Sequence, residues 1–255
     1  MLRAVGCDAY PMADANPSRQ EQLENPSESA AGAHEADVES RWEAGPAVGL
    51  VVLLQVVLAT VSQSQGWTLW RMPWWSWLIL AFPELLLLIS LAWSWPRHQL
   101  EQLGHRRTAA LSLIGLVSVG NGITLLALIA SVLTGHERNG GELLFKGITI
   151  WSTNVITFGL GYWALDRGGP VLRRQADPLP PDFQFPQMEN PQLAEPGWHP
   201  RLFDYVYVSF TNAIAFSPTD AMPLTRWAKV LMMIESAASA ITVLLVAARA
   251  VNILR

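Results

Sequence analysis

The sequence predicts an all-α membrane protein with five transmembrane helices and one further helix that enters the membrane without crossing it. Of the 255 residues, 51% are hydrophobic and only 15% are charged. The apolar residues are concentrated in runs, and a helix of about 20 apolar residues crosses a hydrocarbon core of about 30 Å. The chain also contains 12 Trp, many of them near the ends of these runs, where the membrane interface favours indole rings.

The polar segment 1–44 precedes the first apolar run and is rich in Glu, Ala, Ser and Pro. It holds too little apolar surface to offset the entropy lost on folding, so we expect it to be disordered or only locally helical. It accounts for much of the net charge of −4. No basic cluster of the kind that binds nucleic acid follows it, so we expect the lipid bilayer to be the main partner.

Region 45–142 is expected to contain three membrane helices. The first covers about 47–62, the second about 75–95 and the third about 109–134. The second carries Glu84, next to a proline, at its centre. The third carries Asn121 between two glycines, a pattern that suits close helix approach with the amide bonding to a neighbouring helix.

The remaining region contains two long apolar runs separated by a proline-rich stretch. The fourth run covers about 143–165 and contains Asn154, and the fifth covers about 226–252. Residues 166–200 lack apolar periodicity, which predicts an irregular loop outside the membrane. Residues 202–213 are amphipathic but too short to span a bilayer, which suits a re-entrant helix.

The stretch "SFTNAIAFSPTDAMPLT", residues 209–225, matches a known pattern in register and without a gap. The matching residues are Ser209, Phe210, Thr211, Asp220, Pro223 and Thr225. On these residues, 205–252 resembles the pore module of the potassium-channel superfamily. The resemblance implies a channel-like module over 143–255: an outer helix, the loop 166–200, a re-entrant pore helix and filter over 202–225, and an inner helix over 226–252.

The six residues at the filter position depart from the family. A potassium filter replaces the hydration shell of the ion with rings of backbone carbonyls, and two glycines permit its unusual backbone. Here Ser217 and Thr219 replace those glycines, at about 1–2 kcal/mol each if the same backbone is kept. Pro218 also fixes φ and removes an N–H. We therefore expect a filter that is not of the potassium type. The candidate pore and filter residues are Thr211, Asn212, Ala215, Phe216, Ser217, Pro218, Thr219 and Asp220.

These residues support two functions of different kinds. Around a symmetric pore, four Asp220 carboxylates would form an anionic ring that favours cations. The leading hypothesis is a weakly selective channel for monovalent cations, assembled as a homotetramer in a bacterial plasma membrane. The alternative is a non-conducting scaffold or regulatory subunit that keeps the pore fold, because Ser217, Thr219 and Asp220 are also common turn residues. The sequence indicates no enzyme, metal site or cofactor.

The candidate intramembrane polar residues in the predicted spans are Glu84, Asn121, Asn154 and Glu235. A carboxylate at mid-span is costly in lipid, so Glu84 predicts either an ion-coupled transporter or an interhelical pair with Asn121 or Asn154. Glu235 lies in the last span. By the family resemblance, it sits behind the filter and braces the pore helix.

The membrane orientation is left open by two opposing criteria. The family resemblance places the loop 166–200 and the filter outside the cell. The positive-inside rule does not support this arrangement, because basic residues flank the predicted spans in nearly equal numbers on the two sides. An inverted arrangement therefore remains an alternative.

Overall fold

The structure of the chain is a computed structural model that describes residues 26–68, 73, 75–76, 78–79, 81–82, 85–86, 106–135, 139–173, 179–217 and 220–254. Within these residues the long helices are α2 (Pro26–Gln65), α5 (Arg106–Leu133), α6 (Gly140–Leu165) and α10 (Arg226–Leu254). The shorter elements are η1 (Asp166–Gly168), α7 (Pro170–Arg173), β1 (Phe183–Gln184), α8 (Pro186–Glu189), η2 (Pro191–Leu193), α9 (Leu202–Ala215) and β2 (Met222–Pro223).

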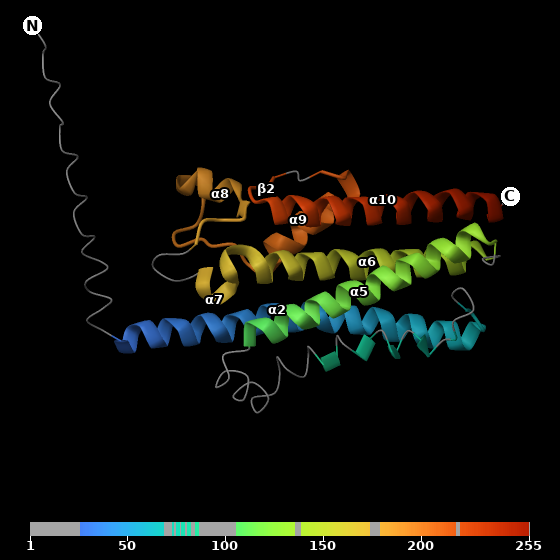
Figure 1. Ribbon diagram of the computed structural model, residues 1–255, viewed down its shortest axis with the longest axis horizontal. Coiled ribbons are helices and arrows are strands. Elements are labelled where there is room, and N and C mark those ends of the chain that lie inside the picture. Colours follow the sequence, from blue (N-terminus) through green and yellow to red (C-terminus); the bar gives the residue numbers. More distant parts are fainter. Residues whose placement is uncertain are drawn as a thin grey trace, which may run out of the picture.

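Helix α6 is the centre of the molecule. It contacts α2, α5, α9 and α10, and Figure 1 shows the long helices side by side with α5 crossing α6 obliquely. The buried side chains form two apolar clusters at different levels of this bundle. One gathers Tyr162, Phe183, Tyr205 and their neighbours near the short elements, and the other gathers apolar residues such as Leu128 and Leu143. Lipid is as apolar as these side chains, so in a membrane van der Waals packing and interhelical hydrogen bonds hold α6 against the other helices.

Three of the helices are long and apolar enough to cross a membrane. They are Ala44–Gln65, Gly140–Gly168 and Arg226–Arg249, among the residues that the structure describes. The described apolar part of α5, Val117–Leu133, is shorter. The predicted span over 75–95 lies mostly outside the described residues, although those described between 76 and 86 are helical. The chain is therefore a mostly helical protein of membrane-like composition.

The N-terminal part of the first helix is longer than the sequence suggests. The segment 1–44 is expected to be disordered or only locally helical, yet α2 begins at Pro26 and continues to Gln65 through Pro46. Residues 1–25 lie outside the described part of the chain. Alanines and glutamates between 26 and 44 favour helix, and the apolar run that follows extends an existing helix without a new nucleation step.

The proline-rich stretch folds over one end of the bundle. Its described parts form one-turn helices and β1, and β1 pairs antiparallel with β2, so that Phe183 is opposite Pro223 and Gln184 is opposite Met222. The backbone N–H of Leu224 also donates to the carbonyl of Asp182, at 2.8 Å. The stretch that precedes α9 is thus attached to the stretch that precedes α10. We call the end of the bundle that carries β1, β2, α7 and α8 the loop end (Figure 1).

A lysine and a glutamate are paired in the first turns of α6. Lys146 is fully buried, and its Nζ lies 2.5 Å from Glu142 Oε1 and donates to the carbonyl of Thr68, at 2.6 Å. Thr68 follows the end of α2 in the chain. A buried ammonium group is tolerated when it is paired and hydrogen-bonded, so Lys146 links the connection after α2 to α6.

Two glycines of α6 allow close helix contacts. A Cβ atom on Gly159 would lie 2.8 Å from the Cα of Val206 on α9, and one on Gly147 would lie 2.9 Å from a methyl group of Val246 on α10. The contact at Gly159 is with backbone atoms, which cannot move aside without shifting α9. The spacing between α6 and α9 therefore depends on the missing side chain.

A Gly159→Ala variant is expected to lower the stability of the detergent-solubilised protein by about 1–3 kcal/mol, because overpacking forces α9 away from α6. Thermal unfolding measures the effect. Gly122→Ala is the matched control, since a Cβ atom there meets nothing within 4 Å. Equal unfolding temperatures for the two variants would contradict the close contact.

Candidate functional site

The chain approaches helix α9 from the loop end of the bundle and returns to the same end after it. At its start, the ring of Tyr205 packs against that of Phe185, with centroids 5.2 Å apart. After it, β2 pairs with β1 in the same stretch of loop. Figure 1 shows α9 running from the loop end toward the middle of α10, after which the chain returns to β2. The chain therefore runs inward from the loop end along α9 and turns back between α9 and β2.

One face of α9 is buried against α6 and α10, and the other is exposed. The buried residues are Leu202, Tyr205, Val208, Ser209, Asn212 and Ala213, at helical spacing. The exposed face carries large apolar side chains, including Phe203, Tyr207, Phe210 and Ile214. The hydroxyl group of Thr211 donates within its own helix, to the carbonyls of Tyr207 and Val208 at 3.0 Å each. Thr211 thus has a local partner, whereas Asn212 faces the protein interior.

The residues at the filter position do not form a continuous extended strand. Ala215 is the last residue of α9, and Phe216 ends the helix in the left-handed region, with φ of 53°. The side chains of Ala215, Phe216, Ser217 and Asp220 are exposed, and Pro218 and Thr219 lie outside the described residues. Ala215 is still helical and Phe216 is the C-cap of α9, so these two residues form a helix end and not part of a row of carbonyls that could replace the hydration shell of an ion.

A buried carboxyl group joins α9 to both neighbouring long helices. Glu235 of α10 is fully buried. Its Oε2 accepts hydrogen bonds from the Tyr162 hydroxyl of α6 and from the Asn212 amide of α9, both at 2.6 Å. Its Oε1 contacts the hydroxyl group of Ser209, which in turn donates to the carbonyl of Val155 at 2.7 Å. The carboxyl group expected behind the filter is thus in contact with α9.

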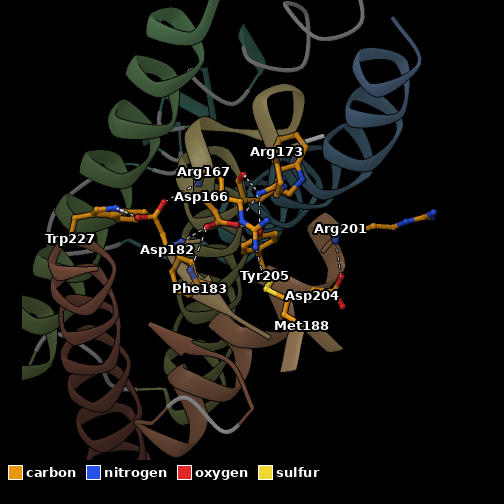
Figure 2. Close-up of polar contacts among 11 residues, drawn as sticks. Asp166, Arg167, Arg173, Asp182, Phe183, Met188, Arg201, Asp204, Tyr205 and Trp227 are labelled. Atoms are coloured by element: carbon orange, nitrogen blue, oxygen red, sulfur yellow. Dashed lines mark hydrogen bonds and ion pairs between the residues drawn. The ribbon is translucent and has the colours of Figure 1, made fainter. Parts of the chain in front are cut away.

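A second buried carboxyl group lies at the loop end (Figure 2). Asp166 ends α6, and its Oδ2 accepts from the hydroxyl group of Tyr205 and from Arg173 Nη1, the latter at 3.4 Å. Arg173 Nη1 also donates to the Tyr205 oxygen, at 2.7 Å. Burial raises the pKa of Tyr205 far above its ordinary value against the opposing effect of Arg173, so the hydroxyl group keeps its proton. The cluster fixes the start of α9 to the end of α6.

Asp182 extends this cluster to α10 (Figure 2). Its backbone N–H donates to Asp166 Oδ1, at 2.8 Å. Its own carboxylate accepts from the backbone N–H of Arg167, at 2.9 Å, and from the indole of Trp227, at 2.8 Å. Arg167 has a left-handed φ of 51°, and this hydrogen bond helps to hold the sharp turn. We call Asp166, Arg173, Asp182, Tyr205 and Trp227 the loop-end cluster.

Sequence reasoning missed the loop-end cluster. Its members are scattered over two helices and a proline-rich loop, and their contacts span up to 45 residues. One usable signal is a charged pair, Asp166 and Arg173, directly after an apolar run. Such charges near a membrane boundary are often paired.

The other predicted polar positions fall in different places. Asn121 makes the expected interhelical bond, donating to the Thr157 hydroxyl of α6 at 2.9 Å. Asn154 is half-buried on α6. Glu84 lies outside the described residues, so its pairing with Asn121 or Asn154 stays a prediction. The structure therefore brings Asn212 and Glu235 together but leaves Asn121 in a separate contact.

A small cavity of about 90 Å³ lies between α8 and α9 at the loop end. Its lining includes Gln187 of α8, Asp204 and Tyr207 of α9, and Asp220. Asp204 also accepts from the backbone N–H of Arg201, at 2.7 Å, at the start of α9. The exposed carboxylate of Asp220 therefore lies beside a cavity that carries a second carboxylate.

Removing the cation of the loop-end cluster should be costly. Arg173→Met leaves the buried Asp166 carboxylate unpaired and is expected to destabilise the protein by about 3–5 kcal/mol. Thermal unfolding in detergent measures the loss. Arg201→Met, at an exposed arginine near the same end, is the control. A loss no larger than that of the control would rule out a buried ion pair at Asp166.

The left-handed backbone at Phe216 can be tested by comparing two truncations. Phe216→Gly and Phe216→Ala both remove the ring, but only glycine adopts a positive φ without a steric penalty. The Gly variant should be more stable than the Ala variant by about 1–2 kcal/mol. Equal stability, or a more stable Ala variant, would argue against the left-handed turn.

Similarity to known proteins gives no information about this site. A comparison of the chain with protein-family models finds no match. Comparisons with curated proteins and with solved structures find none either. The function of the chain therefore has to follow from its own residues and their geometry.

Proposed function

We propose that this chain is an integral membrane protein whose copies assemble around a shared pore, with α9 as a re-entrant pore helix. The observation that carries the proposal is the path of the chain around α9. Two candidate membrane helices, α6 and α10, flank a short helix whose two ends are both attached to the same loop. This path of the chain supports a pore loop, and the sequence resemblance points to the same residues.

The length of α9 supports a segment that enters the membrane and turns back. Its 14 residues correspond to about 21 Å, less than the roughly 30 Å of a hydrocarbon core. The non-helical residues after Ala215 expose backbone groups that lipid cannot satisfy. Non-helical backbone at membrane depth is tolerated where it lines a water-filled cavity or is buried in protein. Neighbouring copies of the chain provide both, and the proposed assembly is a homotetramer in a bacterial plasma membrane.

The mouth of the proposed pore favours cations weakly. Asp220 is exposed, and four copies would form a ring of carboxylates. Ser217 adds an exposed hydroxyl group on the same turn. Because α9 continues through Ala215 and ends at Phe216, fewer residues remain at the filter position for a stack of potassium sites. The proposed activity is therefore weakly selective conduction of monovalent cations.

The same turn also favours a second candidate function. A helix that extends into the filter position shortens the stretch available to bind ions. A protein with this turn could keep the pore fold and conduct nothing, acting as a membrane scaffold or regulatory subunit. The ion-coupled transporter suggested by Glu84 has no comparable support, because that residue lies outside the described part of the chain.

Flux measurements distinguish these functions. Purified protein in liposomes is expected to pass K⁺ and Na⁺ faster than Cl⁻. Asp220→Asn should lower the ratio of cation to anion flux several-fold by removing the carboxylate ring, since the field of such a ring concentrates counter-ions by about tenfold or more. Glu189→Gln, at an exposed carboxylate of α8, is the matched control and should leave the ratio unchanged.

Two outcomes would count against the channel. If folded, oligomeric protein gives no flux above that of empty liposomes, the scaffold function is favoured. If flux occurs but Asp220→Asn and Glu189→Gln give the same ratio as the unmodified chain, the cation selectivity does not arise at Asp220.

A further inference from the structure

Glu235 is a buried carboxyl group in a position where a negative charge has no counter-ion. It lies fully buried in α10, one of the candidate membrane spans. The groups that contact it are Tyr162 from α6, and Ser209 and Asn212 from α9. All of these are neutral. Among the described residues, no Lys, Arg or His forms an ion pair with it, and an unpaired charge buried in this way is strongly unfavourable.

The hydrogen bonds around Glu235 can be counted proton by proton. Ser209 has a single hydroxyl proton but two acceptors in contact, the carbonyl of Val155 and Glu235 Oε1. A carbonyl cannot donate. If Glu235 were ionised, Ser209 could satisfy only one of these two contacts. If Oε1 carries a proton, Glu235 donates to Ser209, Ser209 donates to Val155, and both contacts are hydrogen bonds.

The other carboxyl oxygen is consistent with the same assignment. Oε2 accepts from Tyr162 and from the Nδ2 atom of Asn212. The orientation of the Asn212 amide is fixed independently, because Nδ2 also donates to the carbonyl of Met232, at 3.0 Å, and Oδ1 accepts from Ser236, at 2.9 Å. Donors therefore converge on Oε2, while Oε1 faces a hydroxyl group that already has an acceptor.

Asp166 is a buried carboxyl group in a very different environment. It receives N–H and O–H donors on both oxygens, from Asp182 and Tyr205 among others, and it pairs with Arg173. Among the described residues, no such cation and no backbone N–H donates to Glu235. The two buried carboxyl groups therefore lie in opposite environments, because a cation and backbone donors contact Asp166, whereas only neutral side chains of the described part of the chain contact Glu235.

We propose that Glu235 is a proton-binding site that holds its proton at neutral pH, and that this proton couples α10 through Ser209 to Val155 of α6. Release of the proton would place a charge between the helices and break one of the two bonds of Ser209. The attachment of α9 to α6 and α10 would then weaken. The stability of the fold thus depends on the protonation of one buried residue, whether or not the protein conducts ions.

Infrared difference spectroscopy tests the protonation state directly. The spectrum of the unmodified protein minus that of Glu235→Gln at pH 7 should contain the carbonyl band of a carboxylic acid, which shifts in ²H₂O. Ser209→Ala removes the acceptor of the acid proton and should shift that band. Thr211→Ala, which removes a hydroxyl group two residues away that bonds only within α9, should not. Carboxylate bands in place of the acid band would overturn the proposal.

The pH dependence of stability gives a second test, which can still be carried out if one variant folds poorly. Folded protein that keeps the proton binds one more proton than the unfolded chain, in which water-exposed glutamate ionises at neutral pH. Stability should then fall as the pH rises from about 4.3, where glutamate of the unfolded chain ionises, until the folded carboxyl group itself ionises, by up to about tenfold in the folding equilibrium constant per pH unit. Glu235→Gln keeps a neutral donor and acceptor and should lack this dependence. If Glu235→Gln does not fold, Ser209→Ala replaces it in the test. The pH at the midpoint of the stability change should then differ between Ser209→Ala and the unmodified protein. A dependence shared by all variants would overturn the proposal.

Discussion

The Asp166 carboxylate is the contact that the loop end of the molecule depends on. It stands where α6 stops, and it receives the hydroxyl group of Tyr205, the guanidinium of Arg173 and the backbone of Asp182. These partners belong to α9, to α7 and to the residue directly before β1. A buried carboxyl group is tolerated at this position because a cation and several hydrogen-bond donors surround it. Without it, the start of α9 and the stretch before α10 would lose their common attachment to α6.

Helix α9 is fastened at two levels along one face. Tyr205 and Ser209 are four residues apart, so their hydroxyl groups point to the same side of the helix, and Asn212 follows one turn later. Tyr205 reaches Asp166, whereas Ser209 and Asn212 reach Glu235. Gly159 adds a third constraint, because its missing side chain sets how close α9 lies to α6. Van der Waals packing of the apolar faces holds these helices together, and the polar contacts select one register.

Much of the helical framework was predictable from hydrophobicity alone. Runs of apolar residues locate α6, α9 and α10 to within a few residues, because length and amphipathicity act locally. The start of α2 was misjudged, since a polar segment joined to an apolar helix can extend it. The loop-end cluster could not be foreseen, because Asp182 and Trp227 meet only after the chain has folded. The partner of Asn121, Thr157, was equally invisible, since helical periodicity shows a face but not which neighbour it meets. At the filter position, sequence reasoning identified the lost glycines, but not the helical Ala215 and left-handed Phe216 that accompany them.

The pairing of β1 with β2 has a consequence for how the chain is connected. Between Gln184 and Met222 the polypeptide leaves a two-residue ladder, forms α8, η2 and α9, and comes back to the same ladder. This segment is therefore a long loop whose two ends are joined by the hydrogen bonds between β1 and β2. Because the two ends of this segment are already held together, little further chain entropy is lost when α9 packs against its neighbouring helices. The exposed stretch around η2 could then be lengthened or cut while both pieces stay attached to the same end of the molecule.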